Sequence, residues 1–267
     1  MDKIRRIILE EINRFLLNER WEDVKGEPMS EREVPPKVVL KAYKQVMIRQ
    51  ISKKTGMVYP LYVNSDAGWK IGKWYNAGVG DYKIEIDDKT GEPTGKVRVK
   101  SKLGTLAFRP GLHFGSIPYA PHIYTKKPNF NDEKLPQNLD KRGKLRKDYD
   151  YSKTRLQKKN VVWAECEIAF DRDYNEEATK NGTYINKNGK EVVNPTNACI
   201  KRVPTDGAYR YKTNSNAPDY ETWYISGAFK INRLLSDEEV RDICAQHNIV
   251  SLDRDGILDL SKYPMLT

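Results

Sequence analysis

Residues 160–170, Asn-Val-Val-Trp-Ala-Glu-Cys-Glu-Ile-Ala-Phe, carry the strongest strand signal of the chain. The run is rich in β-branched and aromatic residues, which favour strands. Because side chains alternate between the two faces of a strand, Glu165 and Glu167 share a face with Trp163. Such glutamates are either solvated and paired with lysines or ligand-binding carboxylates, and both interpretations stay open.

Outward from this stretch, alternating apolar and polar residues predict further strands, and helical spacing or capping predicts three helices. The expected strands cover residues 38–48, 57–63, 69–75, 82–86, 96–100 and 221–231. The expected helices cover residues 2–19, 173–180 and 237–247, the last opened by a capping box of Ser236 and Glu239. This pattern predicts an α+β fold with largely antiparallel sheets.

The chain divides into three expected parts. Residues 1–24 form an amphipathic helix, residues 25–37 a linker rich in proline and charge, and residues 38–267 a single α+β domain. The apolar face of the helix, which starts at Ile4 and Ile7, needs a partner surface. That surface belongs either to the main domain or to another chain, including a second copy.

Charge favours an anionic partner. The formal net charge is +10 and the isoelectric point is about 9.3. Residues 126–159 contain twelve Lys or Arg against five acidic residues. This basic insertion is either a solvated segment or a surface that contacts nucleic acid or another polyanion. The candidate nucleic-acid contacts are Lys144, Arg146, Lys147, Lys158 and Lys159.

Several classes of protein are excluded by what the sequence lacks. No apolar run is long enough to cross a bilayer and no secretory signal is present, so we expect a cytoplasmic protein. Cys166, Cys199 and Cys244 have no paired spacing and are expected to be reduced, mostly buried thiols. Motifs of P-loop NTPases, Rossmann dehydrogenases, α/β-hydrolases and zincins are missing.

The candidate site lies around residues 101–123. This Gly- and Pro-rich stretch holds two of the three histidines of the chain, His113 and His122, close to Arg109. It cannot form a long helix, so we expect a strand end and a loop that present these side chains to a ligand. One reading is a metal-dependent nuclease, in which the two histidines ligate a metal with a carboxylate such as Glu165.

Five strings of residues resemble an uncharacterised domain of phage and mobile-element proteins, often found inside very long polyvalent chains. They are residues 58–63, 99–113, 163–165, 203–214 and 223–233. The resemblance spans roughly residues 38–245. It implies a protein that acts on host or phage macromolecules in a bacterial cytoplasm, or one that is associated with the virion.

A second resemblance is to the ADP-ribosyltransferase fold, which implies strands in split sheets and NAD as a substrate. In this fold an early strand offers an Arg or His, a turn of the Gly-x-His-Phe type follows, and late strands bring a carboxylate. Arg49, residues 111–114, residues 161–167 and residues 221–225 fall in that order.

The resemblance to ADP-ribosyltransferases implies roles for several residues. Glu221 or Glu165 is the carboxylate that stabilises positive charge on the ribose, and His113 contacts the ribose. The remaining expected NAD-binding residues are Arg49 and Arg109 for the diphosphate, Tyr209 or Tyr211 for stacking, and His122. The acceptor would be a host protein or another macromolecule. The alternative of another class is a non-catalytic module that binds nucleic acid or belongs to the virion.

Overall fold

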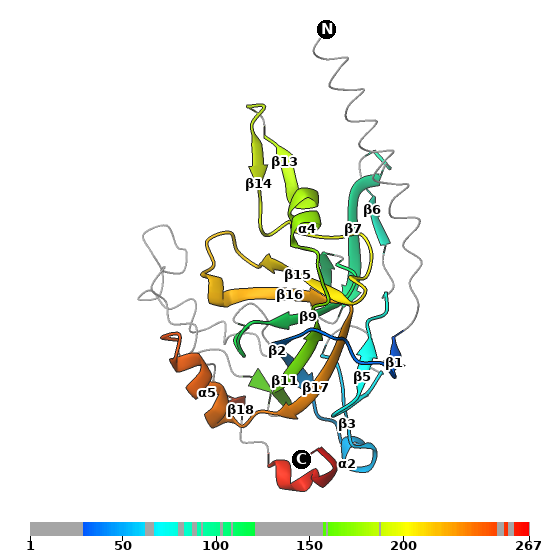
Figure 1. The fold of residues 1–267 in the computed structure, drawn as a ribbon, viewed down its shortest axis with the longest axis vertical. Helices are drawn as coiled ribbons and strands as arrows, with labels where there is room; N and C mark the ends of the chain where they lie inside the picture. Colours follow the sequence, from blue (N-terminus) through cyan, green and yellow to red (C-terminus); the bar gives the residue numbers. More distant parts are fainter. Residues whose placement is uncertain are drawn as a thin grey trace.

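One large sheet with few helices dominates the structure, a computed structural model (Figure 1). It describes residues 29–61, 67–79, 83–86, 90–91, 93–101, 104–107, 109–120, 157–158, 160–186, 188–249, 254–255 and 259–266. The helix expected over residues 2–19 lies outside the described residues, as does the basic insertion except for Gln157 and Lys158.

The large sheet has nine strands in the order β1-β5-β17-β11-β2-β9-β16-β15-β12. Their bounds are β1 Ser30–Arg32, β2 Val39–Met47, β5 Trp74–Asn76, β9 Leu112–Gly115, β11 Val161–Ala169, β12 Arg172–Asp173, β15 Gly207–Lys212, β16 Thr222–Ser226 and β17 Ala228–Leu234. Neighbouring strands are antiparallel except β12 and β15, which are parallel. The expected α+β class with mostly antiparallel strands is confirmed.

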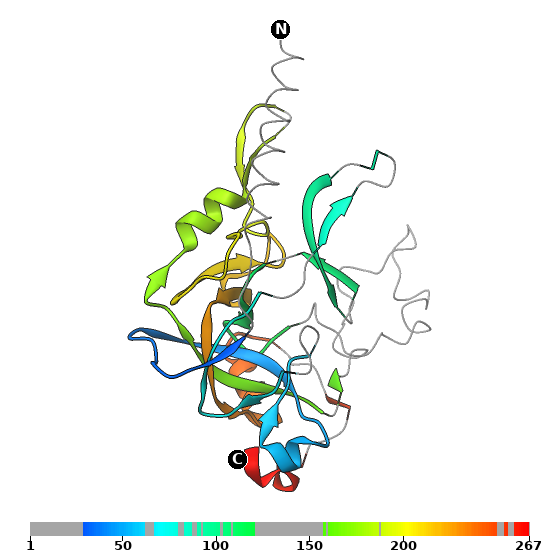
Figure 2. The same ribbon diagram turned by 90° about the vertical axis from the view of Figure 1, so that its right-hand side faces the viewer.

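Smaller sheets and helices surround the large sheet. The small sheets pair β3 Met57–Val58 with β4 Trp69–Lys70, β6 Lys83–Ile86 with β7 Pro93–Ser101 and β8 Gly104–Ala107, β10 Gln157–Lys158 with β18 Arg254–Asp255, and β13 Thr183–Ile185 with β14 Glu191–Val193. The helices are α2 Ser52–Thr55, α4 Asn175–Gly182, α5 Asp237–Ala245, η3 Asp219–Glu221, η4 Leu260–Lys262 and η5 Pro264–Leu266. The β13–β14 hairpin and the β6-β7-β8 sheet extend from the end opposite the C-terminus (Figures 1 and 2).

β11, the strand expected at residues 160–170, lies between β2 and β17 in the middle of the large sheet. It pairs with β2 along its whole length, from Val161 opposite Met47 to Ala169 opposite Val39. Successive side chains of β11 point to opposite faces of the sheet and belong to two separate core clusters. Trp163 belongs to one core cluster, and Cys166 belongs to the other. β11 is therefore covered on both faces, which explains its strong apolar pattern.

The sheet opens between β2 and β9. These strands share one register pair, Tyr43 opposite Gly115, whereas β9 pairs with β16 at four positions. Figure 1 shows β9, β16 and β15 above β2, β11 and β17. Helix α5 lies beside the lower strands and contributes Val240 and Cys244 to the core cluster that contains Trp163. Its predicted capping box is present, since Ser236 Oγ accepts the Glu239 N–H and the Glu239 side chain accepts the Ser236 N–H.

Four segments differ from their expectation. Of the strand expected at residues 57–63, the structure describes residues 57–61, and only Met57–Val58 form a strand, β3. The strand expected at 69–75 is two short strands, because Gly72 adopts a positive φ of 80° and turns the chain. The strand expected at 221–231 is also two, β16 and β17, which belong to different regions of the sheet. Within the segment expected as a linker, residues 30–32 form β1 at one end of the sheet.

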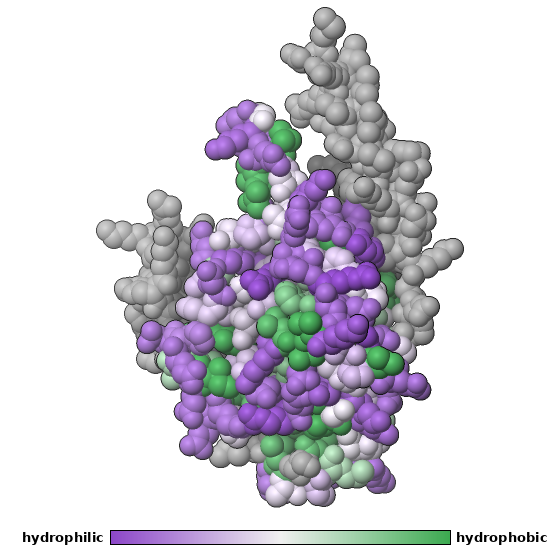
Figure 3. All heavy atoms as spheres, viewed as in Figure 1, coloured by the Kyte–Doolittle hydropathy of each residue, from purple (hydrophilic) through white to green (hydrophobic). Residues whose placement is uncertain are grey.

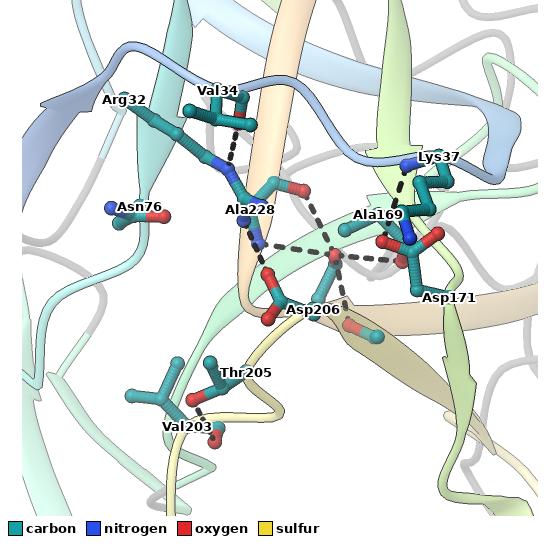
Figure 4. Close-up of polar contacts among 12 residues, drawn as sticks. Arg32, Val34, Lys37, Asn76, Ala169, Asp171, Val203, Thr205, Asp206 and Ala228 are labelled. Carbon is teal, nitrogen blue, oxygen red and sulfur yellow. Dashed lines mark hydrogen bonds and ion pairs between the residues drawn. The ribbon is translucent and has the colours of Figure 1, made fainter.

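The chain passes from β16 to β17 through a polar junction (Figure 4). The fully buried Ser226 hydroxyl lies within 3.4 Å of the carbonyl oxygens of Ala169, Gly207 and Ala228. At Gly227, an added Cβ would lie 2.2 Å from the carbonyl oxygen of Pro204. Residues 203–207 and 226–228 therefore form a junction at which β11, β15, β16 and β17 are in close contact.

Asp206 anchors the same junction from the outside. It adopts a positive φ of 56°, and its carboxylate forms an ion pair with Arg32 of β1 at 2.5 Å (Figure 4). Figure 3, viewed as in Figure 1, shows hydrophilic side chains over most of the visible face of the molecule, with apolar patches that are separate from one another.

Candidate functional site

A groove of about 420 Å³ lies between the large sheet and α5, beside the point where β2 and β9 diverge. This size suits a small-molecule ligand. The lining residues are Lys41 and Tyr43 of β2, Ser116 and Ile117 after β9, Glu165 of β11, Arg233 of β17, and Glu239, Asp242, Ile243, Gln246 and His247 of α5 and its C-terminal end. Polar side chains from three strands, the segment after β9 and one helix with its C-terminal end thus converge on one space.

Glu165 is the centre of an ion-pair network in this groove. Its Oε2 atom lies 2.8 Å from Lys41 Nζ and 3.3 Å from Arg233 Nη2, and Arg233 also pairs with Glu239. Sheet register explains the arrangement, because Glu165 lies opposite Tyr43 on one side and Arg233 on the other. The network joins β2, β11, β17 and α5.

The electrostatic balance keeps Glu165 ionised. Burial by itself raises the pKa of its carboxyl group, but the hydrogen bond and charge of Lys41, with the charge of Arg233, outweigh this and hold the pKa below its usual value. The same hydrogen bond raises the pKa of Lys41. Both partners therefore stay charged at neutral pH.

Ser116 of the groove lining holds the backbone on both sides of Glu221. Ser116 Oγ donates to the Tyr220 carbonyl oxygen at 2.6 Å, and the Ser116 N–H donates to the Thr222 carbonyl oxygen at 3.0 Å. The Tyr220 ring also stacks on His247, with ring centroids 5.4 Å apart. Both Ser116 and His247 line the groove. Burial raises the pKa of the Glu221 carboxyl group.

His113, Tyr211 and Arg109 form a second cluster, held by β9 and β15. His113 Nδ1 lies 3.0 Å from Tyr211 Oη, and the Arg109 guanidinium lies over the Tyr211 ring at 4.6 Å. Burial, partly offset by Arg109, raises the pKa of Tyr211 to about 12, so its hydroxyl stays neutral. Arg109 also donates to the carbonyl oxygens of Thr196 and Ala198 at 2.5 and 3.4 Å. Arg109 therefore ties down the loop before β15.

The remaining expected site residues lie elsewhere. Tyr209 is fully buried in the core and offers no ring face to a ligand in this structure. Arg49 lies two residues beyond the end of β2, where its guanidinium stacks on Tyr59 at 4.4 Å. His122, Lys144, Arg146, Lys147 and Lys159 lie outside the described residues. Lys158 belongs to β10, which pairs with β18.

Of the expected site residues, Glu165 lines the groove, and Glu221 lies on a segment whose neighbouring residues contact Ser116 and His247 of the groove. His113 belongs to the second cluster. The sequence reasoning missed Lys41, Arg233 and Ser116. Lys41 and Arg233 could have been found only from the pairing of β2 and β17 with β11, which links residues distant in the chain. Ser116 belongs to the stretch of residues 101–123 that the sequence singles out, but hydroxyl groups were not part of that signal.

Within the described ranges, no three His, Cys, Asp or Glu side chains are grouped to hold a metal ion. No helix in the same residues is long and apolar enough to span a membrane. Comparison of the chain with models of protein families, with curated proteins and with solved structures found no match.

Proposed function

We propose that this protein is an ADP-ribosyltransferase-like enzyme that binds NAD in the groove beside α5 and modifies a host or phage macromolecule. One observation carries the proposal. β2 and β9 share a single register pair, and beside this point lies a groove with ionised Glu165 in its wall. Ser116 of the groove lining holds the backbone on both sides of Glu221, the late carboxylate that the resemblance implies.

The proposed reaction breaks the bond between nicotinamide and ribose. Nicotinamide leaves with the bonding electron pair as a neutral ring, and positive charge develops at the ribose carbon. A nucleophile of the acceptor forms the new bond to that carbon and releases its proton to solvent. A carboxylate next to the ribose stabilises the transient positive charge, which is the largest contribution that a fixed side chain can make.

Glu221 suits this role better than Glu165. Glu165 already shares its charge between Lys41 and Arg233, so less of its field is available to a new cation. Glu221 forms no ion pair among the described residues. Ser116 fixes the chain on both sides of it. Its backbone is therefore preorganised for charge stabilisation.

The context of the reaction rests on the resemblance to phage and mobile-element proteins. That resemblance supports a bacterial cytoplasm, or a virion, as the place of action and a macromolecule as the acceptor. The net charge of +10 supports an acceptor or partner that is negatively charged.

Release of nicotinamide from NAD tests the proposed reaction. We expect turnover by the full chain and a loss of at least about 100-fold for Glu221→Gln, since the charge at the ribose then lacks its counter-charge. Asp219→Asn is the matched control, because this fully exposed carboxylate lies two residues away and pairs with Lys212. Unchanged turnover by Glu221→Gln, or no turnover with any acceptor tried, would contradict the proposal.

A second candidate function is nucleic-acid binding through residues 126–159, supported by their twelve basic residues against five acidic ones. This second candidate does not involve the groove, because two basic side chains besides His247, against three carboxylates, are too few to bind an extended nucleic acid. Affinity for DNA or RNA is measured across a salt series. A steep loss of affinity with salt, together with no NAD turnover, would favour the binding module over the enzyme.

A further inference from the structure

Two cations in the groove share a single carboxylate oxygen. Lys41 Nζ and Arg233 Nη2 both contact Oε2 of Glu165, at 2.8 and 3.3 Å. Arg233 also pairs with Glu239, so the network holds two cations and two carboxylates, of which Glu165 alone contacts both cations. Both cationic side chains line the groove.

Both cationic side chains stay partly exposed despite their contacts. The side chains of Lys41 and Arg233 are 59% and 49% exposed, whereas Glu165 is 16% exposed. A guanidinium group has five N–H donors. In the part of the chain that the structure describes, Arg233 engages Glu165 and Glu239, which leaves donors directed at solvent.

Glu239 contacts Arg233, but it also has a second role. Its carboxylate accepts the Ser236 N–H at 2.8 Å as part of the capping box at the start of α5. The helix N-terminus stabilises negative charge there. Glu239 is therefore held at the helix end, while Glu165 alone bridges the two cations.

A neighbouring pair shows what an ordinary contact on these strands looks like. Glu167, two residues along β11, pairs with Lys230 of β17 at 2.8 Å and accepts a hydrogen bond from Asn232 at 3.2 Å. Here one carboxylate meets one cation, and neither residue lines the groove. The two-to-one arrangement at Glu165 is thus specific to the groove.

We infer that Lys41 and Arg233 form a binding subsite for a phosphate group, and that Glu165 occupies this subsite as an internal competitor until the ligand displaces it. Two closely spaced, half-exposed cations provide charge-assisted hydrogen bonds to phosphate oxygens, with Arg233 able to bind two of them. The identification of the ligand as the diphosphate of NAD rests on the proposed function. The subsite itself does not.

The subsite is new with respect to the sequence. Arg49 and Arg109, the diphosphate contacts implied by the resemblance, stack on Tyr59 and Tyr211 respectively. Arg109 is further bound to two backbone carbonyl oxygens. Lys41 and Arg233 are the basic side chains, besides His247, that line the groove.

Binding of ADP, measured by titration calorimetry with the full-length chain, tests the subsite without any need for turnover. We expect Glu165→Gln to tighten ADP binding by about ten-fold, because the internal competitor loses its charge. Lys41→Ala and Arg233→Ala, made separately, should each weaken it by at least about ten-fold. Adenosine, which lacks phosphate, should respond to none of these changes.

Glu167→Gln and Lys230→Ala are the matched controls, since they break a similar ion pair on the same strands outside the groove. Both should leave ADP binding unchanged. An unchanged or weaker affinity in Glu165→Gln would overturn the inference, as would intact binding in both cation variants. If Glu165→Gln fails to fold, the two cation variants decide. ADP binding that follows this pattern without nicotinamide release would leave the subsite standing and refute the proposed enzyme.

Discussion

At the scale of single residues, Lys44 shows how the fold constrains a charge. It lies on β2, and its Nζ donates to the His113 carbonyl oxygen at 2.8 Å. The ammonium also lies over the Phe114 ring at 4.8 Å and the Trp69 ring at 5.7 Å. Burial lowers the pKa of Lys44 to about 8, although Cys166 opposes the shift.

Lys44 therefore makes stability depend on pH. In the unfolded chain its pKa is near 10.5, so between about pH 8 and 10.5 the unfolded state binds more protons than the folded state. The contribution of Lys44 to the free energy of folding should become more favourable as pH rises through this window. Below the window, folding carries the full cost of burying the charged ammonium. The free-energy difference between wild type and Lys44→Met should change by about 1–3 kcal/mol between pH 7 and 10.

Urea unfolding at several pH values measures this difference, with the exposed Lys70→Met as the control. Comparing variants cancels the contributions of buried tyrosines and cysteines, which titrate at high pH. A difference that stays constant from pH 7 to 10 would show that the Lys44 ammonium is well solvated.

Ser116 is the residue-scale test of how Glu221 is positioned. Ser116→Ala removes the hydrogen bond to the Tyr220 carbonyl oxygen and leaves the backbone bond to Thr222. If Glu221 stabilises the ribose charge, kcat for nicotinamide release should fall by about ten-fold with KM changed by less than about three-fold. Ser116→Thr, which keeps the hydroxyl, should recover most of the rate. Equal kcat in Ser116→Ala and wild type would remove the positioning role.

At the scale of elements, the sequence was most informative where local pattern and tertiary position agree. The strand at residues 160–170 and the capping box at Ser236 were both predicted, because each depends on residues that are close in sequence. The division of residues 221–231 into β16 and β17 was not predicted. It depends on where Gly227 meets Pro204, a contact between distant segments.

Gly227 provides the element-scale prediction. Gly227→Ala would place a Cβ 2.2 Å from a backbone oxygen, which forces the β16–β17 connection away from residues 203–205. We expect a loss of stability of about 2 kcal/mol or more, by analogy with overpacked cores. Gly189→Ala is the control, because an added Cβ there meets nothing within 4 Å and only its positive φ of 74° opposes alanine.

Thermal and urea unfolding of the two variants give the comparison. Gly189→Ala should cost about 1 kcal/mol or less, since only the left-handed backbone conformation is strained. Equal stability losses at the two positions would mean that the junction relaxes around the added methyl group and that its packing is loose.

At the scale of the whole molecule, the positive charge of the chain is not concentrated in the groove. The chain carries a net charge of +10, yet the groove lining contains more carboxylates than lysines and arginines. Composition predicted an anionic partner but could not locate its site. Glu165 was a candidate from its place on the strongest strand, and Glu221 from the resemblance to ADP-ribosyltransferases. Lys41 and Arg233 were not, because only the pairing of β2, β11 and β17 brings them together.

The most direct measurement is a crystal structure of the protein soaked with NAD. We predict density for NAD or a fragment of it in the groove between the sheet and α5, with a phosphate group on Lys41 and Arg233 and the ribose beside Glu221. Density on another surface, or no density at millimolar NAD in a lattice that leaves the groove open, would contradict the assignment of this groove as the nucleotide site.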